Sequence, residues 1–161
     1  MKEKAKESAL KRSISGAQVL HLASHGKLDS ENPMRSAVYL TPGAKEDGRF
    51  EVSEIIGQKL NADLVVLSAC DTSNGQVVNG EGMMSLSWAF LAAGSRSVLA
   101  TQWSVDSKSA ARDIVLFYEQ MLAGKNKAEA IQAVMKKQIS ARPPFNHPSY
   151  WAGYVSIGDF R

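Results

Sequence analysis

The feature that most constrains the fold is a short apolar run near the middle of the chain. Residues 63–69 read Asp-Leu-Val-Val-Leu-Ser-Ala, with no alternation between apolar and polar side chains. A strand of this kind is buried on both faces, as in a parallel sheet that helices cover on each side. The run therefore predicts a central strand of an α/β domain, and that strand delivers Cys70 at its carboxyl end.

Strands and helices are expected to alternate along the rest of the chain. Further strands are predicted at 19–23, 97–102 and 150–157, and helices at 2–14, 83–93, 107–123 and 127–140. The turn-rich TPGAKEDG between 36–40 and 49–52 predicts a hairpin, and Ser53 is expected to cap a short helix. Asn126 and Glu129 have the spacing of a helix-capping pair. This order indicates an α/β sandwich with a mainly parallel sheet flanked by helices.

The composition fits a single globular domain over residues 1–161. Hydrophobic residues make up 44% and charged residues 22% of the 161 residues, close to the average for globular proteins. The net charge of +3 is spread along the chain, and the one cysteine cannot form an intramolecular disulfide. No apolar run approaches the roughly 20 residues of a membrane span, and the N-terminus does not resemble a signal peptide. We therefore expect a cytoplasmic protein with no nucleic acid and no membrane among its partners.

Two reactive side chains follow expected core strands. His25 comes after the strand at 19–23 and Cys70 after the run at 63–69, and ligands bind beyond the carboxyl ends of strands in such sheets. A thiol is a poor nucleophile until a neighbouring base takes its proton. The separation of 45 residues resembles the spacing of about 50 in caspase-type peptidases. A dyad is one interpretation, and a buried structural cysteine with an exposed histidine is the other.

Other site chemistries have little support in the sequence. One cysteine and three scattered histidines lack the closely spaced ligands of a zinc site, so no metal and no cofactor are expected. The glycine-rich segment 75–82 does not match the phosphate-binding P-loop. His21 lies on the side of its strand opposite Leu20 and Leu22 and is expected either to be structural or to support a site residue from behind. His147, in a proline-rich connector, is expected to form a turn or a packing contact.

Several ordered motifs carry a resemblance to a known family. They are VLHLASHG at 19–26, LSACDT at 67–72 and NGEGMMSLSWAFLAAGSRSVLATQW at 79–103, with further matches at 105–110, 117–138 and 147–159. Together these motifs resemble the CHAT family, caspase-like domains found next to helical TPR arrays, over essentially residues 5–161. The resemblance implies the caspase-haemoglobinase type of α/β fold and the activity of a cysteine peptidase.

The resemblance also implies roles for the two reactive residues. His25 within ASHG matches the catalytic histidine of the family, and Cys70 within SACD matches its catalytic cysteine. The backbone N–H groups of Gly26 and Cys70 match the oxyanion hole, which stabilises the charge that develops on the carbonyl oxygen.

Three further positions are candidates for substrate binding. Asp71 either lines an acidic pocket for a basic side chain, as in related separases, or caps the loop after the strand. Glu81 either contacts substrate or bonds to the loop backbone. Trp103 either walls the cleft or packs under the following helix.

The expected function is that of a cysteine endopeptidase acting on a protein or peptide substrate and activated by a partner or sensor domain. The alternative is a catalytically inactive caspase-like scaffold. Whole domains of the family carry further strand and helix units before the segment matched by residues 5–18, so the N-terminal strands of the full domain are expected to be missing. The chain would then be a fragment, a divergent remnant, or half of a complex in which a TPR-containing or sensor chain supplies those strands.

Overall fold

The computed structural model describes residues 5–68 and 81–161, without the side chains of 81–85. The helices are α1 (Glu7–Ser13), α2 (Val52–Ile56), α3 (Glu81–Ala92), α4 (Ser107–Leu122) and α5 (Lys127–Ile139). The strands are β1 (Val19–Leu22), β2 (Gly26–Lys27), β3 (Ala37–Tyr39), β4 (Arg49–Glu51), β5 (Leu64–Leu67), β6 (Ser97–Thr101) and β7 (Tyr154–Gly158). Short 3₁₀ turns are η1 (Ile14–Gly16), η2 (Pro33–Arg35) and η3 (Pro148–Tyr150).

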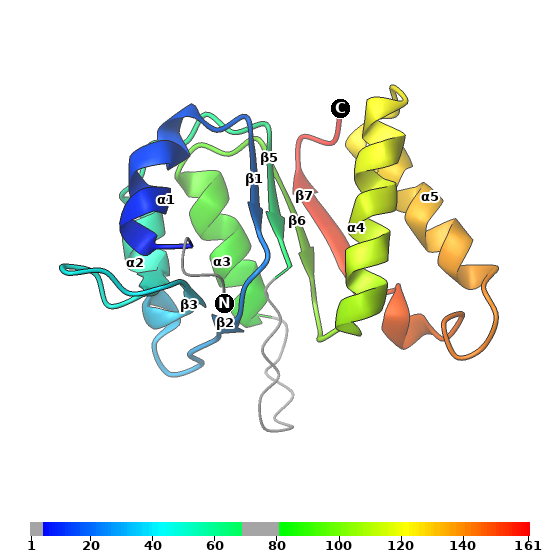
Figure 1. The fold of residues 1–161 in the computed structure, drawn as a ribbon, viewed down its shortest axis with the longest axis horizontal. Coiled ribbons are helices and arrows are strands. Elements are labelled where there is room, and N and C mark those ends of the chain that lie inside the picture. The colour runs from blue at the N-terminus through cyan, green and yellow to red at the C-terminus, as the bar shows by residue number, and fades with distance from the viewer. Residues whose placement is uncertain (1–4, 69–80) are drawn as a thin grey trace.

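The main sheet has the strand order β1-β5-β6-β7. Its first three strands are parallel, and β7 pairs with β6 in the antiparallel direction. Helices α1, α2 and α3 lie on one side of the sheet, and α4 and α5 lie on the other (Figure 1). This mixed α/β architecture, a mainly parallel sheet between two helical layers, confirms the predicted fold class.

The central strand β5 connects the two halves of the core. All four of its residues are buried, and they alternate between the two faces of the sheet as strand geometry requires. Val65 and Leu67 belong to the apolar cluster on the side of α3, whereas Leu64 and Val66 belong to the cluster under α4 and α5. The uninterrupted apolar run is thus explained by burial on both faces, as predicted.

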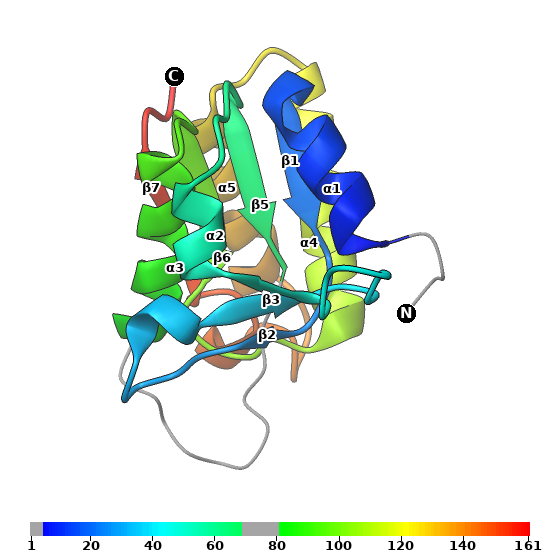
Figure 2. The same cartoon turned by 90° about the vertical axis from the view of Figure 1, so that its left-hand side faces the viewer.

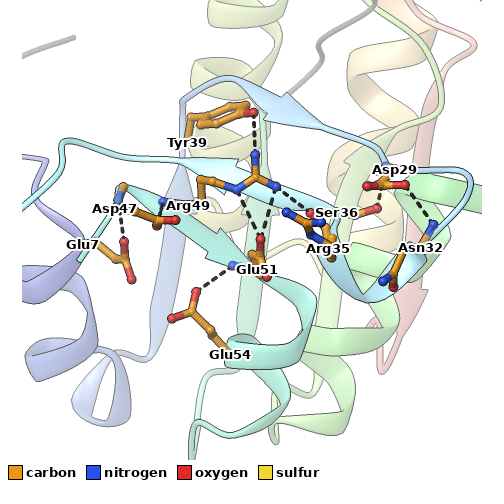
Figure 3. Close-up of polar contacts among 11 residues, drawn as sticks. Glu7, Asp29, Asn32, Arg35, Ser36, Tyr39, Asp47, Arg49, Glu51 and Glu54 are labelled. Atoms are coloured by element: carbon orange, nitrogen blue, oxygen red, sulfur yellow. Dashed lines mark hydrogen bonds and ion pairs between the residues drawn. The ribbon is translucent and has the colours of Figure 1, made fainter. Parts of the chain in front are cut away.

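A smaller antiparallel sheet, β2-β3-β4, lies near the end of the main sheet toward which β1 and β5 point (Figure 2). Arg49 of β4 joins its strands through polar contacts (Figure 3). The guanidinium donates to the Tyr39 hydroxyl at 3.3 Å, pairs with the Glu51 carboxylate at 3.2 Å and donates to the Arg35 carbonyl oxygen at 3.2 Å. The contact with Tyr39 joins β4 to β3, and the contact with Arg35 joins β4 to η2. Strand β3 in turn holds the segment that contains His25.

Two helix starts test the capping predictions. Asn126 and Glu129 form the predicted reciprocal capping box at the start of α5. The short helix α2 is capped differently from the prediction, because Glu51 and not Ser53 is its N-cap. Glu51 and Glu54 form the capping box there, in which the Glu54 carboxylate accepts from the Glu51 N–H at 3.0 Å.

The last strand is shorter than predicted. It begins at Tyr154, whereas the sequence suggested a strand from residue 150. Trp151 was expected inside the strand and is instead the half-buried residue that follows η3. Its Nε1 donates to the Asn146 carbonyl oxygen at 3.1 Å. His147 caps η3 by accepting from the N–H of Ser149, which confirms the predicted turn role of this histidine.

Candidate active site

His25 lies between β1 and β2, just beyond the carboxyl end of β1. Tyr39 of β3 holds this segment through two hydrogen bonds, one to His25 and one to Ser24. Its N–H donates to the His25 carbonyl oxygen at 2.7 Å, and its own carbonyl oxygen accepts from the Ser24 hydroxyl. The His25 side chain itself is exposed. An imidazole that is exposed to solvent, on a backbone held in place by hydrogen bonds, is well placed to exchange protons with a bound molecule.

Gly26 pairs with Val38 across the β2–β3 ladder. In an antiparallel ladder, hydrogen-bonded and non-hydrogen-bonded pairs alternate. The bond from Tyr39 to His25 makes that neighbouring pair the hydrogen-bonded one, so Gly26 and Val38 form the non-hydrogen-bonded pair. The N–H of Gly26 therefore points away from β3, which is compatible with the predicted use of this group as an oxyanion donor.

Cys70 and Asp71 lie outside the described residues, as does the side chain of Glu81. The strand that leads to Cys70 is described to Ser68, whose N–H donates to the Leu22 carbonyl oxygen at 3.0 Å. Because β1 and β5 are parallel neighbours, the strand ends that precede His25 and Cys70 lie side by side. The contact between the two side chains, and the roles of all three residues, stay predictions.

A cavity of about 560 Å³ opens beside His25, between the main sheet and α4. His21, Ser24, His25 and Ser68 contribute polar groups to its lining. Much of the remaining wall is apolar and includes Val66, Leu99, Ile114 and Val115. Sequence reasoning did not find this cavity, because its depth depends on how α4 packs across the sheet.

His21 and Tyr118 meet inside this cavity. Their ring centroids are 5.8 Å apart at an interplanar angle of 52°, and His21 Nε2 lies 3.2 Å from the Ser68 hydroxyl oxygen. Loss of water around the imidazole lowers the pKa of His21, and burial raises the pKa of the Tyr118 hydroxyl. Both side chains are therefore neutral at pH 7. The sequence held a signal for the contact between His21 and Ser68: once the strands at 19–23 and 63–69 are placed side by side, alternation along each strand puts both residues on the same face.

The His21 environment gives a testable titration. We expect its NMR titration midpoint to lie below the ordinary value of about 6.5, because desolvation disfavours the imidazolium. His21 keeps part of its surface exposed to solvent, so the stability linked to this desolvation is small; it is present above about pH 6.5 and is lost as the pH falls through the lowered pKa. Tyr118→Ala admits water and should raise the midpoint, whereas Tyr118→Phe keeps the ring and should leave it low. An equal midpoint in the alanine and phenylalanine variants would contradict the assigned cause.

Trp103 packs on the segment that precedes β7. Its Nε1 donates to the Ser149 carbonyl oxygen at 3.0 Å, and a Cβ added at Gly153 would come within 2.9 Å of the indole ring. The side chain is 37% exposed, so a role in substrate binding stays a prediction.

Within residues 5–68 and 81–161, no group of three or more His, Cys, Asp or Glu side chains is arranged to hold a metal ion. None of the described helices combines the length and apolar character needed to cross a bilayer.

Comparisons with known proteins agree with the motifs. The family model for the CHAT domain matches residues 1–159. Tetratricopeptide repeat protein 28 of Mus musculus is 36% identical over 106 residues, which are 66% of this chain and 4% of that protein. The protein of the same name from Homo sapiens is 33% identical over 136 residues, 84% of this chain and 5% of that protein. The chain thus spans only a small part of these relatives. Matched by the family model over nearly all of its length and folded as a caspase-like α/β sandwich, the chain belongs to the CHAT family.

Proposed function

We propose that this domain is a cysteine endopeptidase in which His25 acts as general base for Cys70. The observation that carries the proposal is the parallel pairing of β1 with β5, in which Leu22 lies opposite Leu67. With this register, β1 and β5 end at the same edge of the sheet, and the segments that contain His25 and Cys70 follow these two strand ends. The exposed His25 ring and the direction of the Gly26 N–H add support.

In the proposed reaction, His25 takes the proton of the Cys70 thiol and the thiolate attacks a peptide carbonyl carbon. The Gly26 and Cys70 N–H groups donate to the oxygen on which negative charge develops. As the intermediate collapses, the carbon–nitrogen bond breaks and His25 returns the proton to the leaving amine. Water, deprotonated by His25, then attacks the thioester, which releases the carboxylic acid product and regenerates the thiol.

Alkylation of the single cysteine tests the dyad independently of any substrate. We expect iodoacetamide to modify Cys70 with a midpoint well below pH 8.5, because an adjacent imidazole stabilises the thiolate. His25→Ala should move the midpoint up toward the ordinary value of about 8.5. The readout is the rate of alkylation by mass spectrometry between pH 5 and 10.

His147→Ala is the matched control, since His147 caps η3 on a segment outside the site. This variant should alkylate like the parent. The dyad would lose its chemical support if Cys70 of the parent reacted only above about pH 8.5. It would also lose it if His25→Ala left the pH dependence of the alkylation rate unchanged.

A partner-binding scaffold is the second candidate, and one observation favours it. Among the described strands of the main sheet, β1 is at the edge, and its outer backbone groups are available to another strand. The apolar side chains of Val19, at the start of β1, and Leu122, at the end of α4, are 46% and 88% exposed. Because the relatives are tetratricopeptide repeat proteins, we propose a TPR-containing or sensor chain as the partner that covers this edge and activates the domain.

Hydrogen exchange on a coexpressed complex checks the partner proposal. The amides of β1 should gain protection when the TPR-containing chain is bound, and Leu122→Asp should weaken the complex. Phe160→Asp, at another exposed apolar position, should leave it intact. Binding that leaves the exchange of β1 unchanged would place the partner elsewhere.

A further inference from the structure

We propose that the cavity beside His25 receives one large, uncharged and mainly apolar side chain of the peptide substrate. The inference rests on the proposed peptidase function, because it treats the cavity as the pocket that selects the cleavage site. His25 lies at the border of the cavity, so a peptide bond presented to this histidine would have a neighbouring side chain at the opening. The volume of about 560 Å³ falls within the usual range of ligand sites, roughly 300–1,000 Å³.

The walls of the cavity are suited to hydrocarbon. Val66 and Leu99 of the sheet form one side, and Ile114 and Val115 of α4 form the other. Ala110, one turn before Ile114 on α4, also lines the cavity, and its small side chain leaves space that a larger residue would fill. Apolar walls on two sides favour a side chain that exchanges water for hydrocarbon contacts.

The charges of the cavity point to the same class of ligand. Among the described lining residues there is no Asp, Glu, Lys or Arg. His21 and Tyr118 titrate outside neutral pH in the directions that keep both uncharged. A charged substrate side chain would lose its hydration here without gaining an opposite charge, which is unfavourable. The Tyr118 hydroxyl is itself buried, without a hydrogen-bond partner among the described residues, and adds no charge to the cavity.

The competing ligand is a basic side chain bound by an acidic pocket around Asp71. The two alternatives predict opposite orders of affinity, so binding of small amino-acid derivatives separates them. The probes are N-acetyl-L-phenylalaninamide, N-acetyl-L-argininamide and N-acetyl-L-aspartic acid amide, each titrated into the Cys70→Ala protein. The readout is the NMR shift of the Val66 and Ile114 methyl groups, which face the cavity.

We expect the phenylalanine derivative to shift these methyl signals at a concentration at least about 10-fold lower than either charged derivative, about 1.4 kcal/mol. Ala110→Asp places a carboxylate in the cavity and should reverse the order of the phenylalanine and arginine derivatives. Ala44→Asp makes the same change at an exposed loop position and should leave the order unchanged. Ala110→Leu, which adds no charge, should weaken all binding by filling the space.

Peptide cleavage then separates failure of the pocket from failure of the peptidase. Active protein should cleave a peptide library beside large uncharged residues, and Ala110→Asp should shift the ratio of kcat/KM toward basic residues by at least 10-fold. Cleavage beside arginine with no preference for the phenylalanine derivative overturns the pocket and leaves the peptidase standing. The same holds if no derivative moves the cavity signals. Preferential binding of phenylalanine without any cleavage overturns the peptidase and, with it, the assignment of the ligand as substrate.

Discussion

Cys70→Ala is expected to abolish peptide cleavage and to leave the fold intact. Without the sulfur no thioester can form, and the loss of a nucleophile acting with a base typically lowers kcat by roughly 10⁴–10⁶-fold. The substitution is small, since it removes a single sulfur atom from the side chain. The measurement is cleavage of a peptide library followed by mass spectrometry, with circular dichroism melting of the same preparations.

The matched variants follow from the dyad acting as a unit. His25→Ala should be nearly as severe as Cys70→Ala, and the double variant should be little worse than either, because residues that work together are not additive. Ser53→Ala, at an exposed residue of α2, should cleave like the parent. Undiminished cleavage by Cys70→Ala would remove the peptidase proposal and leave the scaffold.

Sequence reasoning predicted the fold well where the pattern depended on burial alone. The apolar run of β5 indicated a strand covered on both faces, and the all-buried pattern confirms it. The same holds for β6, which is also buried throughout. Such patterns are readable because each face of a parallel sheet must be covered by helices. Leu86 and Phe90 of α3, the helix predicted at 83–93, are buried where that helix covers the sheet.

Features that depend on tertiary contacts were harder to predict. The cap of α2 at Glu51 follows from where β4 ends, and the late start of β7 follows from the η3 turn that His147 caps. The cavity required the position of α4, which local patterns do not supply. Its Tyr118 contact with His21 links a helix and a strand nearly 100 residues apart in the sequence. The sequence therefore predicted the end of the sheet at which His25 lies, but it did not predict the cavity beside it.

Phe50→Ala is expected to produce the largest loss of stability among the substitutions considered. Phe50 of β4 is 0% exposed, and its ring meets that of Phe90 on α3 edge to face, with centroids 6.3 Å apart. Removing a buried phenylalanine side chain typically costs about 3–5 kcal/mol, because hydrocarbon is lost and a cavity remains. Urea unfolding followed by circular dichroism measures this difference in the free energy of unfolding.

Phe160→Ala is the matched control, since its side chain is 56% exposed and its loss should change stability by no more than about 0.5 kcal/mol. Phe50 also has a link to the site, because it pairs with Val38 on β3, the strand whose Tyr39 holds the backbone at His25. Hydrogen exchange at the Tyr39 amide should therefore accelerate in Phe50→Ala under conditions where most molecules are still folded. If Phe50→Ala cost less than about 1 kcal/mol, the small sheet could not be packed on α3 as described, and the support for His25 would have to come from elsewhere.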